Sequence, residues 1–429
     1  MSILFSKKNI INILFSLIPL SFIAGNLLIN INIILIIFSS IFFYRKDLFD
    51  INFSKIDKII IIFFTYLIFL GSISTIYKYF YENLNDFTVL IKSITFLRFL
   101  ILYFIIKYLL KNNILNLKYF FFSGSVFVSI IIFDVIFQFI FGFNIFGFER
   151  LYPRHITSFF KDEAIAGSYI QRFSLFILFL FPIFFIFKKK FYNFLVSSLI
   201  IMVTFASLVL AGNRMPLMIF LFSVLLLIFF QKNLRKHIIS FLALLSIIFL
   251  CLYNFSPNIK IHYGNFLVKS YRIVSSIVTG NIDPKNPGWL FHGHFKEFYA
   301  GYETWKLNKF VGHGVKSFRF NCPKTIVNNC GPHPHNYYLE LMSELGLVGL
   351  AVIVYLYFYI VWQYLRKRKN LKLSFIHNNY LNVFFILFFV ELFPIKTTGS
   401  FFTTGNATYL FLILAILSSL LKKDNLIKK

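Results

Sequence analysis

Long apolar runs recur along the whole chain, and they constrain its fold more than any other feature. A helix of about 20 apolar residues is needed to cross the hydrocarbon core of a bilayer. Hydrophobic residues make up 58% of the 429 residues. In a water-soluble protein, so much apolar surface would leave large exposed patches. The sequence therefore predicts an all-α polytopic membrane protein.

We predict a membrane span at each of twelve apolar segments, of which the first two are short and could form a tight hairpin joined by Gly25-Asn26. They lie at 10–24, 27–43, 59–77, 87–106, 119–141, 164–187, 194–211, 215–231, 237–254, 346–365, 380–396 and 403–421. This layout divides the chain into nine N-terminal spans within 1–254, a large polar loop at 255–345 and three C-terminal spans within 346–429. Because a loop of this length is usually functional, we expect it to carry the chemistry.

Basic residues mark one side of the predicted bundle. Short loops such as Lys188-Lys189-Lys190 and Arg366-Lys367-Arg368-Lys369 follow alternate spans, whereas the opposite short loops hold few. By the positive-inside rule, both termini are cytoplasmic and the large loop is external. The formal net charge of +27 is therefore topogenic. We predict no nucleic-acid partner, because no basic face is interleaved with aromatic residues in a soluble domain.

Two of the three cysteines lie in the large loop. Cys322 and Cys330 are eight residues apart, and an external compartment is oxidising, so we predict a disulfide between them. Two free thiols or a metal pair are the alternatives. Cys251 lies in an apolar span, where packing accounts for it.

A histidine stands where the polar loop re-enters the membrane. The segment reads Pro334-His335-Asn336, followed by nine residues and then Gly346-Leu347-Val348-Gly349. Asn336 can cap a helix over Tyr337–Leu345, which would put His335, Leu339, Met342 and Gly346 on one face. A neutral imidazole there can accept a proton from a sugar hydroxyl. The alternative is an interfacial histidine that only packs or hydrogen-bonds.

The His-Asn-x9-Gly-x-x-Gly arrangement resembles the signature of the O-antigen ligase and O-antigen polymerase superfamily, and the resemblance extends over about 130–429. It implies a GT-C-like glycosyltransferase of the bacterial inner membrane, with its large loop in the periplasm. The donor would be an undecaprenyl-pyrophosphate-linked saccharide among membrane lipids. The acceptor would be lipid A core for a ligase, which we favour slightly, or a lipid-linked glycan for a polymerase.

The resemblance also implies roles for individual residues. His335 would be the general base of an inverting transfer that needs no metal and no other cofactor. Gly346 and Gly349 would allow close helix approach or a bend at the membrane. The residues assigned to substrate or pyrophosphate binding are Arg214, Arg172, Arg272, Arg319, His333 and Asn336.

Each arginine also has an alternative role that involves no substrate. A guanidinium suits pyrophosphate oxygens, and a charge at the end of a span is costly unless it is functional or paired. Arg214 could instead snorkel to lipid headgroups. For Arg172, pairing with Glu163 is an equal alternative. Arg272 and Arg319 could be ordinary loop charges.

Three alternatives to a metal-independent glycosyltransferase remain: a zinc-like site in the large loop, a flippase, and a purely structural membrane protein. The histidines of the large loop could form a zinc-like site, although no carboxylate or cysteine cluster completes it; they are His292, His294, His313, His333 and His335. A flippase for lipid-linked glycans would show internally repeated spans, and none is evident. A purely structural membrane component would have no need of arginines in costly positions.

Overall fold

The computed structural model describes residues 6–45, 48, 53–81, 83–151, 154–184, 190–230, 235–278, 294–327, 330–370 and 375–422. Within these ranges the regular structure is helical, and the only extended pairing is a single bridge between Phe143 and Glu149. This agrees with the predicted all-α class.

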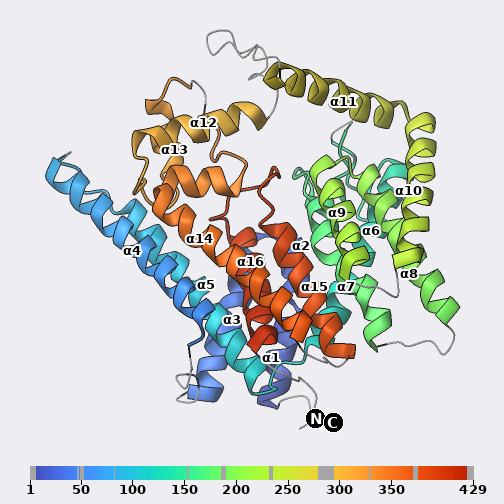
Figure 1. The fold of residues 1–429 in the computed structure, drawn as a ribbon, viewed down its shortest axis with the longest axis horizontal. Helices are drawn as coiled ribbons and strands as arrows, with labels where there is room; N and C mark the ends of the chain where they lie inside the picture. Colours follow the sequence, from blue (N-terminus) through green and yellow to red (C-terminus); the bar gives the residue numbers. More distant parts are fainter. Residues whose placement is uncertain are drawn as a thin grey trace. The chain divides into compact units, whose positions relative to one another are not determined.

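The chain forms two compact units, each assembled from separate stretches of sequence. Unit 1 comprises 1–36, 113–279 and 374–390, and unit 2 comprises 37–112, 280–373 and 391–429. The division falls within α3 (Asn26–Tyr44) and at the end of α15 (Phe375–Glu391). Figure 1 shows the helices of both units.

Unit 1 is built around α6 (Leu117–Phe141) and α7 (Ala166–Phe184), which pack along each other. The short helices α1 (Lys7–Ser16) and α2 (Ile18–Ala24) pack on α6. The remaining elements of this unit are η2 (Ser158–Phe160), α8 (Lys190–Leu210), α9 (Arg214–Phe230), α10 (Arg235–Phe255), α11 (Pro257–Val278) and most of α15.

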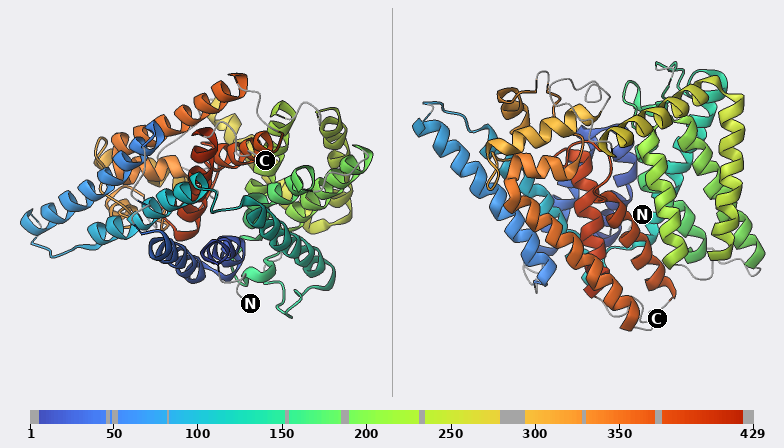
Figure 2. Two further views of the ribbon diagram at one scale, coloured as in Figure 1. Left: turned by 90° about the horizontal axis from the view of Figure 1, so that it is seen from below. Right: turned by 45° about the horizontal axis from the view of Figure 1, so that its top comes forward.

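Unit 2 is centred on α5 (Thr88–Lys111), which packs between α4 (Lys55–Tyr81) and α16 (Thr404–Lys422). The long helix α14 (Tyr337–Asn370) packs against α4. The polar elements α12 (His294–Leu307), α13 (Phe318–Asn321) and η4 (Cys322–Lys324) precede α14 in the chain, and α12 packs on α14. The turned views in Figure 2 show α12 beside the N-terminal end of α14.

A buried ion pair and the hydrogen bonds of a neighbouring tyrosine connect three helices of unit 2. The ammonium of Lys107 on α5 contacts the Asp57 carboxylate on α4, and the Tyr103 hydroxyl donates to the same carboxylate at 2.6 Å. Tyr103 also bonds Ser418 of α16 at 3.0 Å. Such a buried charge is tolerated in apolar surroundings only when it is fully partnered.

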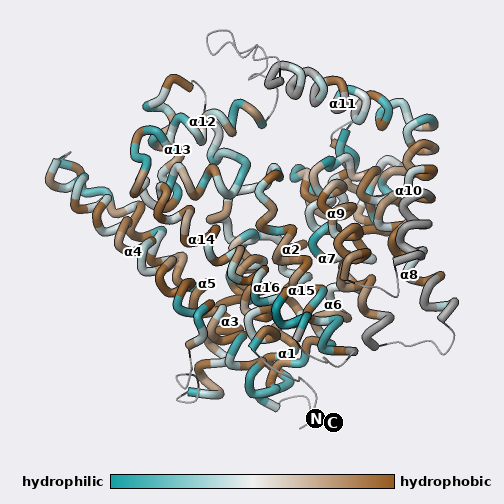
Figure 3. The backbone as a smooth tube through the Cα atoms, viewed as in Figure 1, coloured by the Kyte–Doolittle hydropathy of each residue, from teal (hydrophilic) through white to brown (hydrophobic). Residues whose placement is uncertain are grey.

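Helices occur at all twelve predicted spans, but they differ in length. Among the described residues, six helices are long and apolar enough to cross a membrane, and up to eight qualify if each of two bent helix pairs forms one span. Figure 3 shows hydrophobic residues along α4, α5 and α14, and more hydrophilic ones on α12 and α13. The chain is thus a multi-pass membrane protein by helix length and composition, and the number twelve stays a prediction.

Two regions depart from the predicted layout. The predicted span 380–396 ends early, because α15 stops at Glu391, three residues before Pro394, where a helix cannot readily continue. The predicted polar loop at 255–345 contains helices α11, α12 and α13. The described parts of this loop are therefore ordered by local helical structure as well as by the disulfide described below.

Candidate functional site

His335 lies in a turn immediately before α14. Its backbone φ is +53°, a left-handed conformation that is uncommon for residues other than glycine. The Asn336 side chain accepts hydrogen bonds from the amides of Tyr338 and Leu339, at 2.9 and 3.1 Å, so the predicted cap is confirmed. The helix begins at Tyr337. The expectation that His335 shares a helical face with Leu339 was therefore wrong, because the cap stands between them.

A returning segment of the chain holds this turn in place. The Asn336 side-chain amide donates to the carbonyls of Pro394 and Lys396, at 2.8 and 3.1 Å. The amide of Thr398 donates to the His335 carbonyl at 2.8 Å. An unusual φ persists only where surrounding contacts enforce it, and these contacts do so on both sides of His335.

Three imidazole rings gather at this point. The ring centres of His333 and His335 are 4.2 Å apart, and those of His294 and His335 are 4.8 Å apart. Burial lowers the pKa of His335, while the charge of Glu297 and a hydrogen bond with the backbone of Thr398 oppose this shift. Burial also lowers the pKa of His333 to about 4 and lowers that of His294. The three rings are therefore neutral at pH 7 and able to accept a proton.

Two buried glutamates of α14 bind the loops that surround the histidines. The Glu340 carboxylate accepts from the amide of Phe401 at 2.6 Å and from the hydroxyl of Ser400. The Glu344 carboxylate accepts from the amides of Lys316 and Phe318, at 2.5 and 3.3 Å. Each carboxylate thereby orders a segment that is distant in the sequence. Sequence reasoning missed both residues.

The Gly-x-x-Gly motif is a break in α14. Gly346 has the non-helical angles φ +64° and ψ −169°. This region of backbone conformation is essentially restricted to glycine. Figure 1 shows that the ribbon of α14 is bent toward its N-terminal end. The Gly312-His313-Gly314 loop closes on the break, because the amides of His313 and Gly314 donate to the Glu344 carbonyl at 2.9 and 2.7 Å. The expected bend at Gly346 is confirmed.

A tyrosine of α4 completes this junction. The Tyr66 hydroxyl lies 2.9 Å from the Val311 carbonyl and 3.0 Å from the Leu345 carbonyl. A Cβ added at Gly349 would lie 2.3 Å from the Cβ of Leu345 in the same helix and 3.2 Å from the Tyr66 ring of α4. Gly349 therefore permits the close helix approach that its motif predicts.

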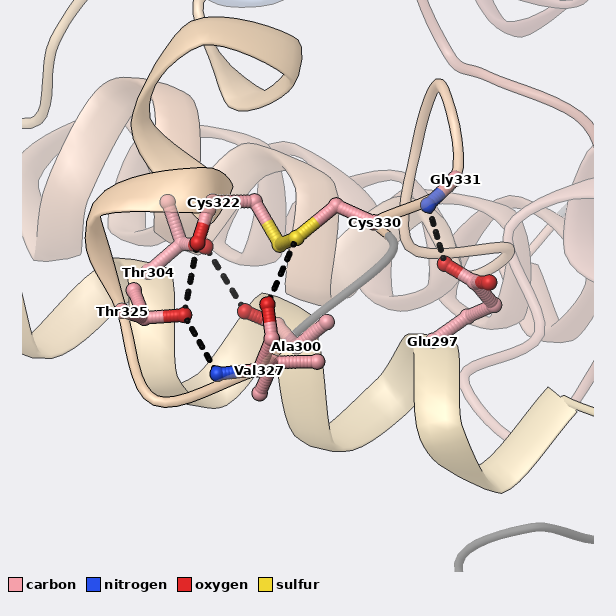
Figure 4. The surroundings of a disulfide bond; sticks show 8 residues. All are labelled: Glu297, Ala300, Thr304, Cys322, Thr325, Val327, Cys330 and Gly331. Atoms are coloured by element: carbon pink, nitrogen blue, oxygen red, sulfur yellow. Dashed lines mark hydrogen bonds between the residues drawn. A yellow bond between two sulfur atoms is a disulfide. The ribbon is translucent and has the colours of Figure 1, made fainter.

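A disulfide joins Cys322 to Cys330, with their Cα atoms 6.1 Å apart (Figure 4). Cys322 packs in a small core with Ala300, Phe318 and Val327. Beyond the bridge, the amide of Gly331 donates to the Glu297 carboxylate of α12 at 3.2 Å, as Figure 4 shows. The bridge and this hydrogen bond tether the chain that leads to His333 onto α12. Cys251, the remaining cysteine, is exposed.

Unit 1 holds a separate cluster of basic side chains. The turn Ala211-Gly212-Asn213 precedes Arg214 at the start of α9, and a Cβ at Gly212 would collide with the Arg154 carbonyl. Burial lowers the pKa of His155, and the positive charges of Arg154, Arg214 and Arg150 lower it further. A hydrogen bond with the backbone of Ala211 acts in the opposite direction and raises this pKa. The turn therefore gathers three arginines and a neutral histidine, of which only Arg214 was a predicted site residue.

The other predicted arginines are distributed over both units. Arg172 lies half-buried on α7 in unit 1. The first turn of α7 is joined to the Arg214 turn, because the Gly167 amide donates a 3.2 Å hydrogen bond to the Asn213 side chain. Arg272 belongs to α11 in the same unit. Arg319 is exposed on α13 in unit 2, the unit that carries His333 and His335.

Among the residues that the structure describes, no group of three or more His, Cys, Asp or Glu side chains is arranged to hold a metal ion. His292, one member of the zinc-like alternative, lies outside the described residues.

Residues 198–354 match the family model described as O-Antigen ligase. This region of the chain is therefore similar to the O-antigen ligase family. The matched region runs from α8 through the loop of unit 2 to the first part of α14, so it includes Arg214 and His335. The family consists of glycosyltransferase-like membrane enzymes acting on lipid-linked saccharides. A search of curated proteins found no match.

Proposed function

We propose that this protein, like the O-antigen ligase family that its residues 198–354 match, transfers a glycan from undecaprenyl pyrophosphate to a hydroxyl of lipid A core at the periplasmic face of the inner membrane. The observation that carries the proposal is the neutral, half-buried His335, held by backbone contacts in the family's signature sequence. A base of this kind needs a pKa near or below the working pH and a fixed direction toward its substrate.

The proposed reaction is an inverting displacement. The acceptor hydroxyl gives its proton to a ring nitrogen of His335, and its oxygen attacks the anomeric carbon. The bond from that carbon to the pyrophosphate oxygen breaks, and undecaprenyl pyrophosphate leaves with the electron pair. We assign Arg214 to bind the negatively charged pyrophosphate as it leaves, because guanidinium groups bind phosphate oxygens in a bidentate manner. Arg172 and Arg272 are further candidates for this role.

The second candidate function is a polymerase of the same superfamily, in which a lipid-linked glycan replaces lipid A core as the acceptor. A specific observation keeps it open: basic side chains cluster in both units, so each unit offers positive charge to a phosphorylated lipid.

The deciding experiment uses the full chain in detergent with an undecaprenyl-pyrophosphate-linked oligosaccharide and EDTA. Lipid A core and a second lipid-linked saccharide are offered as acceptors in separate reactions, and the product is resolved by mass. We expect transfer to lipid A core. Transfer only to the lipid-linked saccharide identifies the polymerase. Movement of the donor across vesicles without any transfer would contradict both and point to a flippase.

The pH profile of transfer tests the assignment of His335 as base. Because its folded pKa lies below the usual 6.5, the base is fully active at neutral pH and activity falls only as the pH drops through the lowered pKa. Glu297 raises that pKa, so Glu297→Gln should move the acid limb of the kcat profile to lower pH. Glutamine keeps an oxygen that can accept the Gly331 amide.

Glu303→Gln is the matched control for this shift. Glu303 lies on the same helix, and its carboxylate pairs with Lys306 at 2.6 Å. The acid limb should stay in place in this variant. If the acid limb of the kcat profile is identical in wild type and Glu297→Gln, His335 is not the base whose titration the profile reports.

A further inference from the structure

Four basic side chains lie around the loop of unit 2, and three of them were not among the predicted site residues. They are Lys92 and Arg98 on α5, and Lys316 and Arg319 at the loop that closes on α14. The loop meets α5 directly, because a Cβ at Gly314 would collide with the Val89 side chain. The Lys92 ammonium lies 5.5 Å from the ring centre of Phe320, the neighbour of Arg319.

Carboxylates are close to this cluster, but other groups already occupy them. Glu344 binds the amides of Lys316 and Phe318, and Glu340 binds the amide of Phe401. Asp86 pairs with Lys78 at 2.6 Å. As a result, none of the four cations forms an ion pair with any residue in the described ranges.

The cations also act on one another. Burial lowers the pKa of Lys316, and the positive charges of Arg319 and Arg98 lower it further, against the opposing charges of Glu340 and Glu344. Lys316 has a backbone φ of +58°, so the loop accepts an unusual conformation at this residue. The Arg98 guanidinium packs 4.4 Å from the Phe99 ring centre and bonds Thr404 at 3.3 Å, while its buried Nε has no partner among the described residues.

We propose that Lys92, Arg98, Lys316 and Arg319 form a phosphate-binding site of unit 2 that holds the phosphate of the acceptor lipid. An anion with several oxygens can accept hydrogen bonds from all four donors and offset their mutual repulsion. The site lies in the same unit as His335, the base that would deprotonate the acceptor. The Arg150, Arg154 and Arg214 cluster belongs to unit 1, and we assign that cluster to the donor.

The inference rests on the proposed transfer, but its test includes a readout that does not. The full chain in detergent is titrated with inorganic pyrophosphate by calorimetry, comparing wild type with Lys92→Gln/Lys316→Gln. These substitutions remove charge while leaving the Lys316 amide free to bond Glu344. We expect the double variant to lose one class of bound pyrophosphate, and Lys260→Gln, an exposed lysine on α11, to bind as wild type does.

Kinetics then identify the source of the phosphate. With a phosphorylated acceptor, the double variant should raise the acceptor KM about tenfold or more, since each hydrogen bond to a charged group typically contributes about one order of magnitude in affinity. The donor KM should stay within about twofold, and an acceptor stripped of phosphate should not distinguish variant from wild type. A higher donor KM with an unchanged acceptor KM would overturn the assignment to the acceptor.

Two further outcomes separate the alternatives. If the double variant loses affinity for phosphatidylglycerol vesicles over phosphatidylcholine vesicles but keeps wild-type kinetics, the site holds a bilayer headgroup and the acceptor assignment is wrong. An unchanged pyrophosphate isotherm in the double variant would refute the site itself. If wild type transfers nothing but the variant still loses pyrophosphate, the proposed function fails and the anion site stands.

Discussion

Replacing His335 by alanine is expected to reduce glycan transfer by about 10²- to 10⁴-fold, the usual contribution of a positioned general base. The side chain itself carries little of the fold, because the contacts that define this turn use the His335 carbonyl and the Asn336 side chain. The loss should therefore appear in kcat, with the thermal unfolding midpoint close to that of wild type. Single-turnover transfer from the lipid-linked donor is the measurement.

His313→Ala is the matched control for this variant. His313 belongs to the same polar stretch and is also half-buried, with a pKa lowered by burial, but it contacts Glu344 through its backbone amide. Its loss should change transfer by less than about threefold, within the range of ordinary substitutions away from a reaction centre. Full transfer by His335→Ala would rule out the proposed base.

Replacing Gly346 by alanine is expected to produce the largest loss of stability. Its φ and ψ, +64° and −169°, lie in a region that costs a residue with a Cβ about 1–3 kcal/mol. In addition, the new Cβ would collide with the Phe310 carbonyl and lie 2.6 Å from the Val311 nitrogen. We expect a destabilisation of about 3 kcal/mol or more, with loss of transfer, measured by thermal unfolding in detergent.

Gly25→Ala separates the two causes. Gly25 has a similar backbone conformation, φ +101° and ψ 177°, but nothing lies within 4 Å of the position that its Cβ would take. It should show the conformational cost and retain transfer. Equal unfolding midpoints and equal transfer in the two variants would show that the contact between Phe310 and Gly346 has no role.

The sequence alone predicted the features that depend on nearby residues. Asn336 caps α14 because its side chain reaches amides two and three positions onward, and Gly346 breaks the helix after nine intervening residues. The pairing of Cys322 with Cys330 was likewise a local prediction, and the structure contains that disulfide.

Contacts between distant residues were not predictable in this way. Glu340 and Glu344 look like ordinary helix residues until the segments at 400–401 and 316–318 return to bind them. His335 was expected on a helical face because periodicity does not report a left-handed φ. Arg154 lies near the Arg214 turn because Gly212 packs against the backbone of a loop from much earlier in the chain. The presence of Gly212 was the only feature of the sequence that indicated this close contact.

Because α14 is broken at Gly346, the orientation of His335 does not depend on how many residues the membrane part of α14 contains. In an uninterrupted helix, adding or removing one residue turns everything beyond it by about 100°. Here the stretch from Tyr337 to Leu345 is oriented by its own contacts, while the stretch after the break is fixed separately by hydrogen bonds from Leu347 to Lys309 and from Val348 to Phe310. We therefore expect that lengthening or shortening the apolar half of α14 beyond the break leaves the orientation of His335 unchanged.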